Sequence, residues 1–289
     1  MSALSYKWTA DGKEHAFELV PVRGTGGGTY LFGSEPNRRP VEIHDFYMAT
    51  TPVTQALWQH VMGSNESKNP GIRFPVENVS WDHINERGGF LDRINASEIL
   101  KTMNNHGADA GATSSEYGQA TSITHRPMSF RLPSETEWEY AARGGPHWRD
   151  GFIYSGSNDP KEVAWYGPQW NRGHELVLRV FGWPRGWRMA NRLKFRRLVT
   201  CTHEVASKAP NQLGIYDMSG NVWEWCQDVS TDDWNCVPPD GSPYVGPGDT
   251  RRLRGGCHHN WNLHCTVSWR YGIEPGAHDH CIGFRLVMA

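Results

Sequence analysis

The apolar residues of the N-terminal half recur at helical spacing in two places. In residues 55–62 they fall on one helical face, Thr54 can act as the N-cap and Gly63 as the left-handed stop. A second helix is predicted from about 82 to 95, with inward-facing Phe90, Leu91 and Ile94. Residues 104–126 are rich in Asn, Gly, Ala, Ser and Thr, which predicts a surface loop.

A third, short helix is indicated in residues 134–143. Ser134 and Glu137 have the spacing of a capping box, and Gly144 can adopt the left-handed stop. Trp138 would then face the core together with an alanine one turn later. The periodicity fades after this point, and no long helix is predicted beyond residue 200.

Strand patterns lie mainly before residue 50. Residues 17–23 and 29–33 flank a glycine-rich turn at 24–28, which predicts a β-hairpin. Residues 41–48 alternate between apolar and polar types, as a further strand would.

The composition points to an irregular fold with many turns. The 289 residues include 31 Gly, 18 Pro and 14 Trp, so large aromatic side chains fill a loop-rich structure. A net charge of -2 argues against bulk attraction to nucleic acid or to an anionic membrane. The sequence predicts no membrane span and no leader peptide, and we expect a cytoplasmic protein whose six cysteines remain thiols.

Several motifs, in a fixed order, resemble those of the formylglycine-generating-enzyme-like (sulfatase-modifying factor) family. The stretches that carry the resemblance are 51–54 (TPVT), 74–82 (FPVENVSWD), 130–145 (FRLPSETEWEYAARGG), 211–225 (NQLGIYDMSGNVWEW), 254–256 (RGG) and 283–286 (GFRL). The resemblance implies a single α+β domain over 1–289, with its core from about 17 to the C-terminus, of the C-type-lectin-like class. Fold alone leaves function open, because the family includes oxidases and non-catalytic binding proteins.

The resemblance to the copper-dependent oxidases of this family is incomplete. Those enzymes hold copper(I) with two cysteines five residues apart after the Arg-Gly-Gly motif, and soft thiolates suit that ion. Here the second position is Cys265, but the first is Asn260, whose amide is a poor ligand for copper(I). Cys257 or Cys281 would have to supply the second sulfur. Iron sulfoxide synthases of similar fold use a His-x3-His-x-Glu motif, a spacing absent from this sequence.

The stretch from 257 to 281 contains five of the 14 histidines and three of the six cysteines. This density suggests a metal site, with candidate ligands Cys257, His259, His264, Cys265, His280 and Cys281. The paired Cys-x2-Cys spacing of structural zinc sites is absent, so packing of neutral histidines with buried thiols is the favoured alternative.

The same stretch resembles the region that varies in the variable proteins of diversity-generating retroelements, between a fixed Arg-Gly-Gly and a terminal Gly-Phe-Arg-Leu. That resemblance implies a non-catalytic protein that binds an unknown protein or other macromolecule through 257–281, with Trp261 and Trp269 as framework. The residues predicted to contact the ligand are His258, His259, Asn260, Asn262, His264, Thr266, His278 and His280. An ordinary family member with an unusual loop is the alternative.

Two further sites are predicted. A basic, Trp-containing insertion at about 170–208, with its basic residues at 172–197, would contact an acidic or nucleic-acid partner, or form a solvated loop. The family resemblance also implies structural calcium at the Gly220-Asn-Val-Trp-Glu-Trp element, with ligands from Asn221, the Val222 carbonyl and Glu224. A hydrogen-bonded turn is the alternative there.

Overall fold

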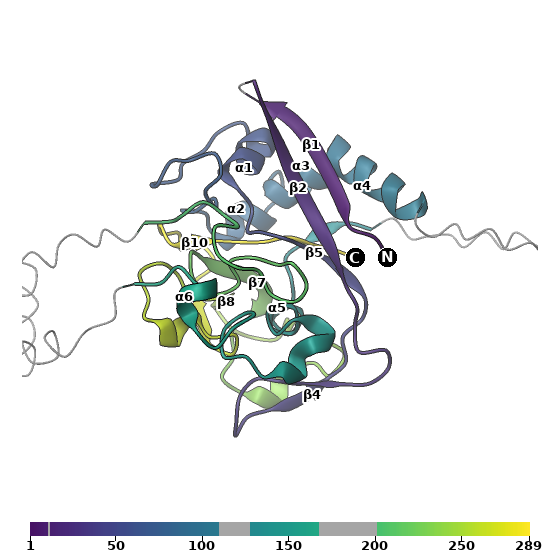
Figure 1. Cartoon of the computed structure of the whole chain (residues 1–289), viewed down its shortest axis with the longest axis vertical. Coiled ribbons are helices and arrows are strands. Elements are labelled where there is room, and N and C mark those ends of the chain that lie inside the picture. The colour runs from purple at the N-terminus through teal and green to yellow at the C-terminus, as the bar shows by residue number, and fades with distance from the viewer. Residues whose placement is uncertain (11, 110–127, 168–200) are drawn as a thin grey trace, which may run out of the picture.

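The computed structural model describes residues 1–10, 12–109, 128–167 and 201–289 (Figure 1). The larger of its sheets has five strands in the order β1 (Leu4–Ala10), β2 (Lys13–Val22), β5 (Phe46–Ala49), β11 (Val287–Met288) and β6 (Phe130–Arg131). All neighbours in this sheet are antiparallel. Strands from both ends of the chain therefore build one sheet.

The smaller sheet has four strands in the order β10 (Ile282–Gly283), β7 (Trp223–Val229), β8 (Arg251–Arg254) and β9 (Arg270–Ile273). Strand β10 runs parallel to β7, whereas the other pairs are antiparallel. A separate pair consists of β3 (Tyr30–Phe32) and β4 (Arg39–Val41). The short strands β8 and β9 flank the loop that carries most of the predicted site.

Local sequence signals account for two of the helices. Helix α1 (Gln55–Met62) begins where Thr54 Oγ1 accepts a hydrogen bond from Leu57 N, and it ends at Gly63 with φ 83°. Helix α5 (Glu135–Ala142) has the predicted capping box between Ser134 and Glu137. Both predictions are confirmed.

The predicted second helix is in fact two. Helix α2 (Trp81–Asn85) stops before Gly88, whose φ is 79°, and α3 (Phe90–Asn95) begins after Gly89. A Cβ on Gly89 would lie 2.7 Å from the His83 carbonyl oxygen, so the chain turns tightly here.

Three other expectations fail in whole or in part. Helix α4 (Glu98–Asp109) extends into the predicted loop 104–126, which is wrong up to residue 109; residues 110–127 lie outside the described part. The predicted hairpin is wrong as well, because β2 pairs with β1 and β5, and β3 with β4. The glycine-rich turn bends toward 41–46 instead, where Thr25 N donates to the Ile43 carbonyl. The strand predicted at 41–48 is split between β4 and β5.

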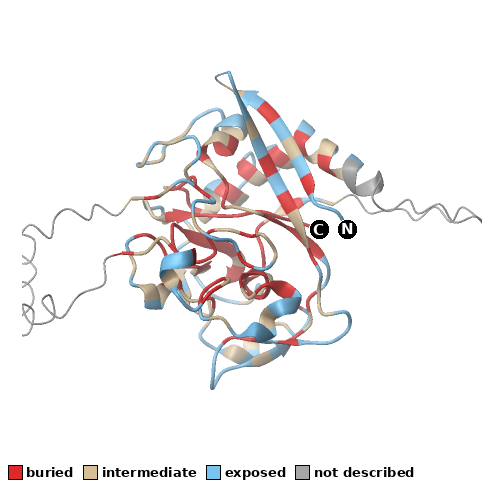
Figure 2. Cartoon of the chain, in the orientation of Figure 1, coloured by how far each residue is buried: buried red, intermediate tan, exposed pale blue. Residues whose placement is uncertain are grey.

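The C-terminal tail links the two sheets. It runs through the middle of the molecule, entering the smaller sheet as β10 and the larger as β11 (Figure 1). Figure 2 shows this tail as buried along its length. On the side of the early helices, Phe284 packs edge-on against Phe90, which stacks on Trp58 at 5.2 Å between ring centroids. A second core surrounds α5, with Trp138 fully buried in it.

The remaining elements are short. They are the 3-10 helices η1 (Gly145–Asp150), η3 (Trp234–Cys236) and η4 (Asn262–Cys265), and α6 (Pro160–Val163). Short helices and separate, mostly antiparallel sheets confirm the predicted α+β class. Within the described ranges, no helix has the length and apolarity that a bilayer span requires.

Candidate functional site

The predicted site is built on a group of buried charges, which we call the ionic frame: Glu135, Glu139, Arg252, Arg254 and Arg270. Glu135 and Glu139 lie on α5, and the arginines lie on β8 and β9. Arg270 makes a two-pronged contact with Glu135 at 2.7 Å, and Arg254 donates to Glu139 at 2.6 Å. Burial alone would raise the pKa of Glu135, but Arg252, Arg270 and Arg254 outweigh it and lower that pKa to about 2.

The ionic frame holds both ends of the following loop. Arg254 donates through Nη2 to the Val267 carbonyl at 2.7 Å and through Nη1 to the Ser268 carbonyl at 3.3 Å. Gly256 has φ 71°, and a Cβ there would lie 2.6 Å from the His264 carbonyl oxygen. The Arg-Gly-Gly motif therefore lets the chain at Gly256 pack closely against the end of the loop at His264.

We call residues 257–281 the recognition segment. Of its predicted contact residues, His259 and His278 are exposed, whereas Asn260, Asn262, His264, Thr266 and His280 are half-buried. His258 is only 1% exposed, so the prediction that it faces a ligand is wrong for the surface as it stands. Its backbone N–H donates to the Asn221 carbonyl at 3.0 Å, which draws this residue into the protein.

The two tryptophans predicted as framework differ. Trp269 is half-buried and lies edge-on to His264, with centroids 4.6 Å apart. Trp261 is 48% exposed, so assigning it to the framework is wrong. Asn260, predicted as a ligand contact, is engaged by the protein backbone instead. Its side-chain oxygen accepts a hydrogen bond from Cys257 N at 3.0 Å, and its carbonyl accepts one from Gly167 N at 2.7 Å. It braces the loop.

Sequence reasoning missed the exposed apolar side chains of the recognition segment. Leu263 is 55% exposed and Tyr271 is 48% exposed. Ile153 is exposed as well, and its carbonyl accepts from Val267 N at 3.0 Å beside the segment. A lone Leu or Ile normally indicates the core, so only the short, turn-rich spacing of this stretch could have signalled the exposure.

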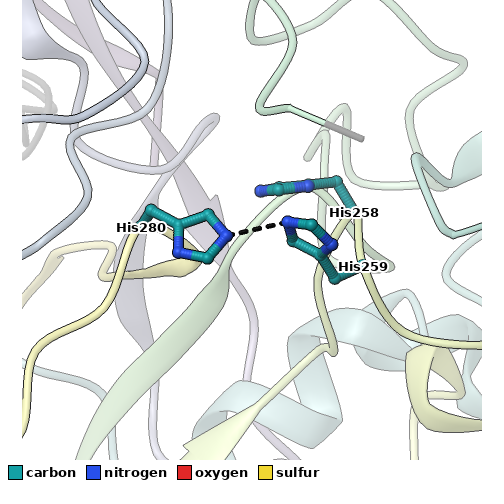
Figure 3. A group of neighbouring side chains, drawn as sticks. All are labelled: His258, His259 and His280. Carbon is teal, nitrogen blue, oxygen red and sulfur yellow. Dashed lines mark hydrogen bonds between the residues drawn. The ribbon is translucent and has the colours of Figure 1, made fainter. Parts of the chain in front are cut away.

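Three histidines converge within the recognition segment, and we call them the histidine cluster: His258, His259 and His280. Each offers a ring nitrogen within 4.8 Å of the others. His258 and His259 project from one loop and His280 from the chain opposite, and a dashed line joins the Nε2 atoms of His259 and His280, 2.7 Å apart (Figure 3). Of the six ligands predicted from sequence, only His259 and His280 belong to this cluster, whereas His258 was predicted as a ligand contact.

The surroundings of the cluster set its protonation. His280 Nδ1 lies 2.5 Å from an Asp279 carboxylate oxygen, so in the neutral ring this nitrogen carries the proton and Nε2 keeps its lone pair. Burial, followed by repulsion from His259, lowers the pKa of His258 to about 3. Burial lowers the pKa of His259, and electrostatic repulsion from His280 lowers it further. Sequence reasoning missed Asp279, although it directly precedes His280.

The Cys265 thiol faces backbone carbonyl groups, and no hydrogen bond joins it to a second thiol among the described residues. Its sulfur lies 3.9 Å from the Cys257 carbonyl and 3.7 Å from the Trp261 carbonyl, and burial raises its pKa. The thiols of Cys257 and Cys281 instead hydrogen-bond to each other, which lowers the pKa of Cys257 and raises that of Cys281. Because Asn260 is engaged by the backbone, these residues do not fit the copper site of the family.

Two of the three predicted calcium ligands, Asn221 and Glu224, are engaged by protein donors. The Glu224 carboxylate receives two 2.6 Å hydrogen bonds from Arg285 and one from Trp138 Nε1. Asn221 Oδ1 accepts from His203 N at 3.0 Å, and Val222 is fully buried. An ion would have to displace this network, and calcium here stays an untested prediction.

Residues 172–197 of the basic insertion lie outside the described part of the chain, as does most of the predicted range 170–208. The acidic or nucleic-acid partner predicted for it stays a prediction.

Comparison with known protein families agrees with the motifs. The sulfatase-modifying factor enzyme 1-like domain matches residues 13–289. The chain belongs to this family. Formylglycine-generating enzymes are among its relatives: the one from Streptomyces coelicolor is 33% identical over 159 residues, which cover 54% of this chain and 45% of that protein.

Two other similar proteins match more of the chain. The chaperone protein LppX of Paenibacillus barcinonensis is 36% identical over 215 residues, covering 72% of this chain and 70% of that protein. The solved structure of Treponema denticola variable protein 1 matches with a TM-score of 0.62 and 27% identity, covering 98% of each chain. The predicted resemblance to both the formylglycine-generating enzymes and a variable protein is therefore confirmed.

Proposed function

We propose that this family member is a non-catalytic protein that binds a macromolecular ligand through the recognition segment. The observation that carries the proposal is the contrast within the segment. The backbone at Val267 is held by a hydrogen bond from Arg254, and the Val267 side chain is buried. Trp261, Leu263 and Tyr271 are instead exposed. Large aromatic side chains held on a fixed backbone are typical anchors of protein interfaces, because little conformational entropy is lost when they bind.

The polar residues of the segment suit the same role. His259 and His278 are exposed, and Asn262 and Thr266 are half-buried at the surface. Such side chains can donate and accept hydrogen bonds around apolar anchors. The similarity to Treponema denticola variable protein 1 over almost the whole chain supports a frame on which this region is free to change.

A copper-dependent oxidase working through Cys265 is the competing function. The similarity to the Streptomyces coelicolor enzyme favours it, but Asn260 and the carbonyl-facing Cys265 sulfur argue against it. Titration of the reduced protein with copper(I) separates the two. We expect no binding that depends on Cys265; stoichiometric copper lost in Cys265→Ser would favour the oxidase.

Paired libraries test the binding function directly. One library varies Trp261, Asn262, Leu263, Thr266 and His278; the control varies exposed residues of the β1–β2 hairpin, namely Ser5, Lys7, Thr9, Glu14 and Ala16. Both are displayed on cells and sorted for binding to streptavidin with its biotin sites blocked. We expect folded binders from the first library alone. Equal yields from the two libraries, or no folded variants from the first, would refute the proposal.

Sister copies of the gene provide a second test. If the recognition segment is the part that varies, differences between copies should concentrate at its surface positions and spare Arg254 and Gly256. Differences scattered evenly along the chain would count against a variable surface.

A further inference from the structure

We propose that the histidine cluster binds a transition-metal dication of the zinc class through one ring nitrogen each of His258, His259 and His280. Three imidazoles make a ligand set that suits zinc, copper(II), nickel and iron(II), and that hard ions such as calcium and magnesium do not favour. The binding of metal by this cluster does not depend on the recognition function proposed above.

The distances are close to those of a metal site. With metal–nitrogen bonds of about 2.0–2.1 Å in a tetrahedron, neighbouring nitrogens lie about 3.3 Å apart. The Nε2 atoms of His259 and His280 are 2.7 Å apart, and all three ligand nitrogens lie within 4.8 Å of one another. The 2.7 Å separation must widen when a metal binds, which side-chain rotation of the exposed His259 can achieve.

His258 supplies the second line of evidence. It is 1% exposed, and neither of its ring nitrogens has a well-formed hydrogen bond to a described residue, since its contact with the His280 backbone is a poor one. Buried polar atoms nearly always have a partner, and an exception calls for an unseen water or ion. The ring of His258 faces the other two histidines, with its centroid 4.3 Å from that of His259 and 5.8 Å from that of His280 (Figure 3). A metal bound there would satisfy it.

Asp279 positions the third ligand. Its contact with His280 Nδ1 leaves Nε2, the atom that faces His259, with the lone pair that a metal needs. A carboxylate behind a ligating histidine is the usual arrangement at metal sites, where it fixes the tautomer and strengthens the ligand. In the metal-free protein, the Nε2 proton of His259 fills the contact that the metal would take.

Three protein ligands leave a fourth tetrahedral position open. Because His259 is exposed, this position is accessible from the protein surface. A carboxylate or imidazole of a bound macromolecule could complete the coordination, and this role, unlike metal binding itself, rests on the proposed recognition function. The metal would then contribute to the recognition segment a fixed positive charge at the surface, whereas Arg270 is paired with Glu135.

Calorimetric titration of the full-length protein with Zn²⁺ alone tests the site. We expect one ion per chain, lost in His259→Ala and in His280→Ala, whose side chains lie at or near the surface. His278→Ala is the matched control, because it removes an exposed histidine of the same segment outside the cluster, and it should bind as the parent does. Asp279→Asn should weaken binding by about 10–100-fold, as loss of a carboxylate behind a ligand does.

Cobalt(II) identifies the ligand atoms. The Co²⁺ complex should show weak visible bands without the intense near-ultraviolet charge transfer that thiolates give, and Cys257→Ser and Cys281→Ser should leave it unchanged. Undetectable Zn²⁺ binding, binding that survives in His280→Ala, or a thiolate band that disappears in Cys257→Ser would each overturn the proposal. None of these outcomes bears on the library test of recognition, so the two proposals fail separately.

Discussion

The ionic frame and the recognition segment are in contact and share Arg270, but their polar side chains lie in different surroundings. In the frame, Glu135 and Glu139 are at most 4% exposed and are paired with arginines at 2.6–3.4 Å. In the segment, most polar side chains are exposed or half-buried, and His258 is a buried exception. Buried charges held in ion pairs fix one backbone arrangement, whereas exposed groups can change without that cost. Stability and recognition are thus assigned to different residues.

Removing a charge from the ionic frame should have the largest effect. Glu135→Gln leaves Arg252, Arg254 and Arg270 without their shared carboxylate, and breaking a buried pair in this way costs about 3–5 kcal/mol. Urea unfolding measures this loss. The control is Glu98→Gln, which breaks the exposed pair with Lys101 and should cost less than about 1 kcal/mol. Equal losses in both variants would remove the distinction.

Acid should reveal the same frame in the unmodified protein. The folded pKa of Glu135 is about 2 against its ordinary 4.5. A carboxyl with a lowered folded pKa stabilises above its unfolded pKa, and this stabilisation, about 3 kcal/mol here, is lost as pH falls from 4.5 to 2. Urea unfolding between pH 2 and 5 should show this loss in the parent and a shallower one in Glu135→Gln. Parallel pH profiles would contradict the assignment.

The cap of α5 should have an intermediate effect. Ser134 Oγ accepts from Glu137 N at 3.1 Å and donates to the Gly241 carbonyl at 2.7 Å. Ser134→Ala removes both contacts, and loss of an N-cap costs about 0.5–2 kcal/mol, with the upper end expected at this buried site. Thr54→Ala at the cap of α1 is the comparison and should cost less, because Thr54 is half-buried. Thermal or urea unfolding measures both losses, and a larger loss in Thr54→Ala than in Ser134→Ala would contradict this order.

Changes on the recognition segment should have the smallest effect on stability. Leu263 and His278 are exposed, and Leu263→Ala and His278→Ala should each change the free energy of unfolding by no more than about 0.5 kcal/mol. Val267→Ala, in the buried root of the same segment, is the contrasting variant and should cost several times more. If the surface variants unfolded as readily as the buried one, the segment would not be a tolerant surface.

The sequence correctly predicted helix ends, which depend on residues close together in the chain. The caps at Thr54 and Ser134 and the stop at Gly63 were predictable, because each involves residues three to nine positions apart. The break at Gly88 and Gly89 was visible in the sequence but was overruled by the apolar spacing around it. The ordered motifs predicted the family and the α+β class, since they pertain to the whole chain.

Long-range pairing was not predictable from one sequence. Glu135 and Arg270 lie 135 positions apart, so nothing local links them. The pairing of β2 with β5, where a hairpin with the β3 region was predicted, was also not visible in the sequence. A glycine-rich turn is compatible with several geometries. In the recognition segment the residue types were visible but their directions were not: His258 and His259 are neighbours, yet one is buried and the other exposed. Convergence of His280 on them depends on the path of the intervening loop.

A pooled substitution scan of residues 254–281 and α5, with cell-surface protease resistance as the measure of folding, tests the central claim most directly. We expect most substitutions at Trp261, Leu263 and His278 to leave resistance unchanged, and nearly all substitutions at Arg254 and Glu135 to abolish it. A scan in which the exposed and the buried positions were equally sensitive would contradict a fixed frame that supports a changeable surface.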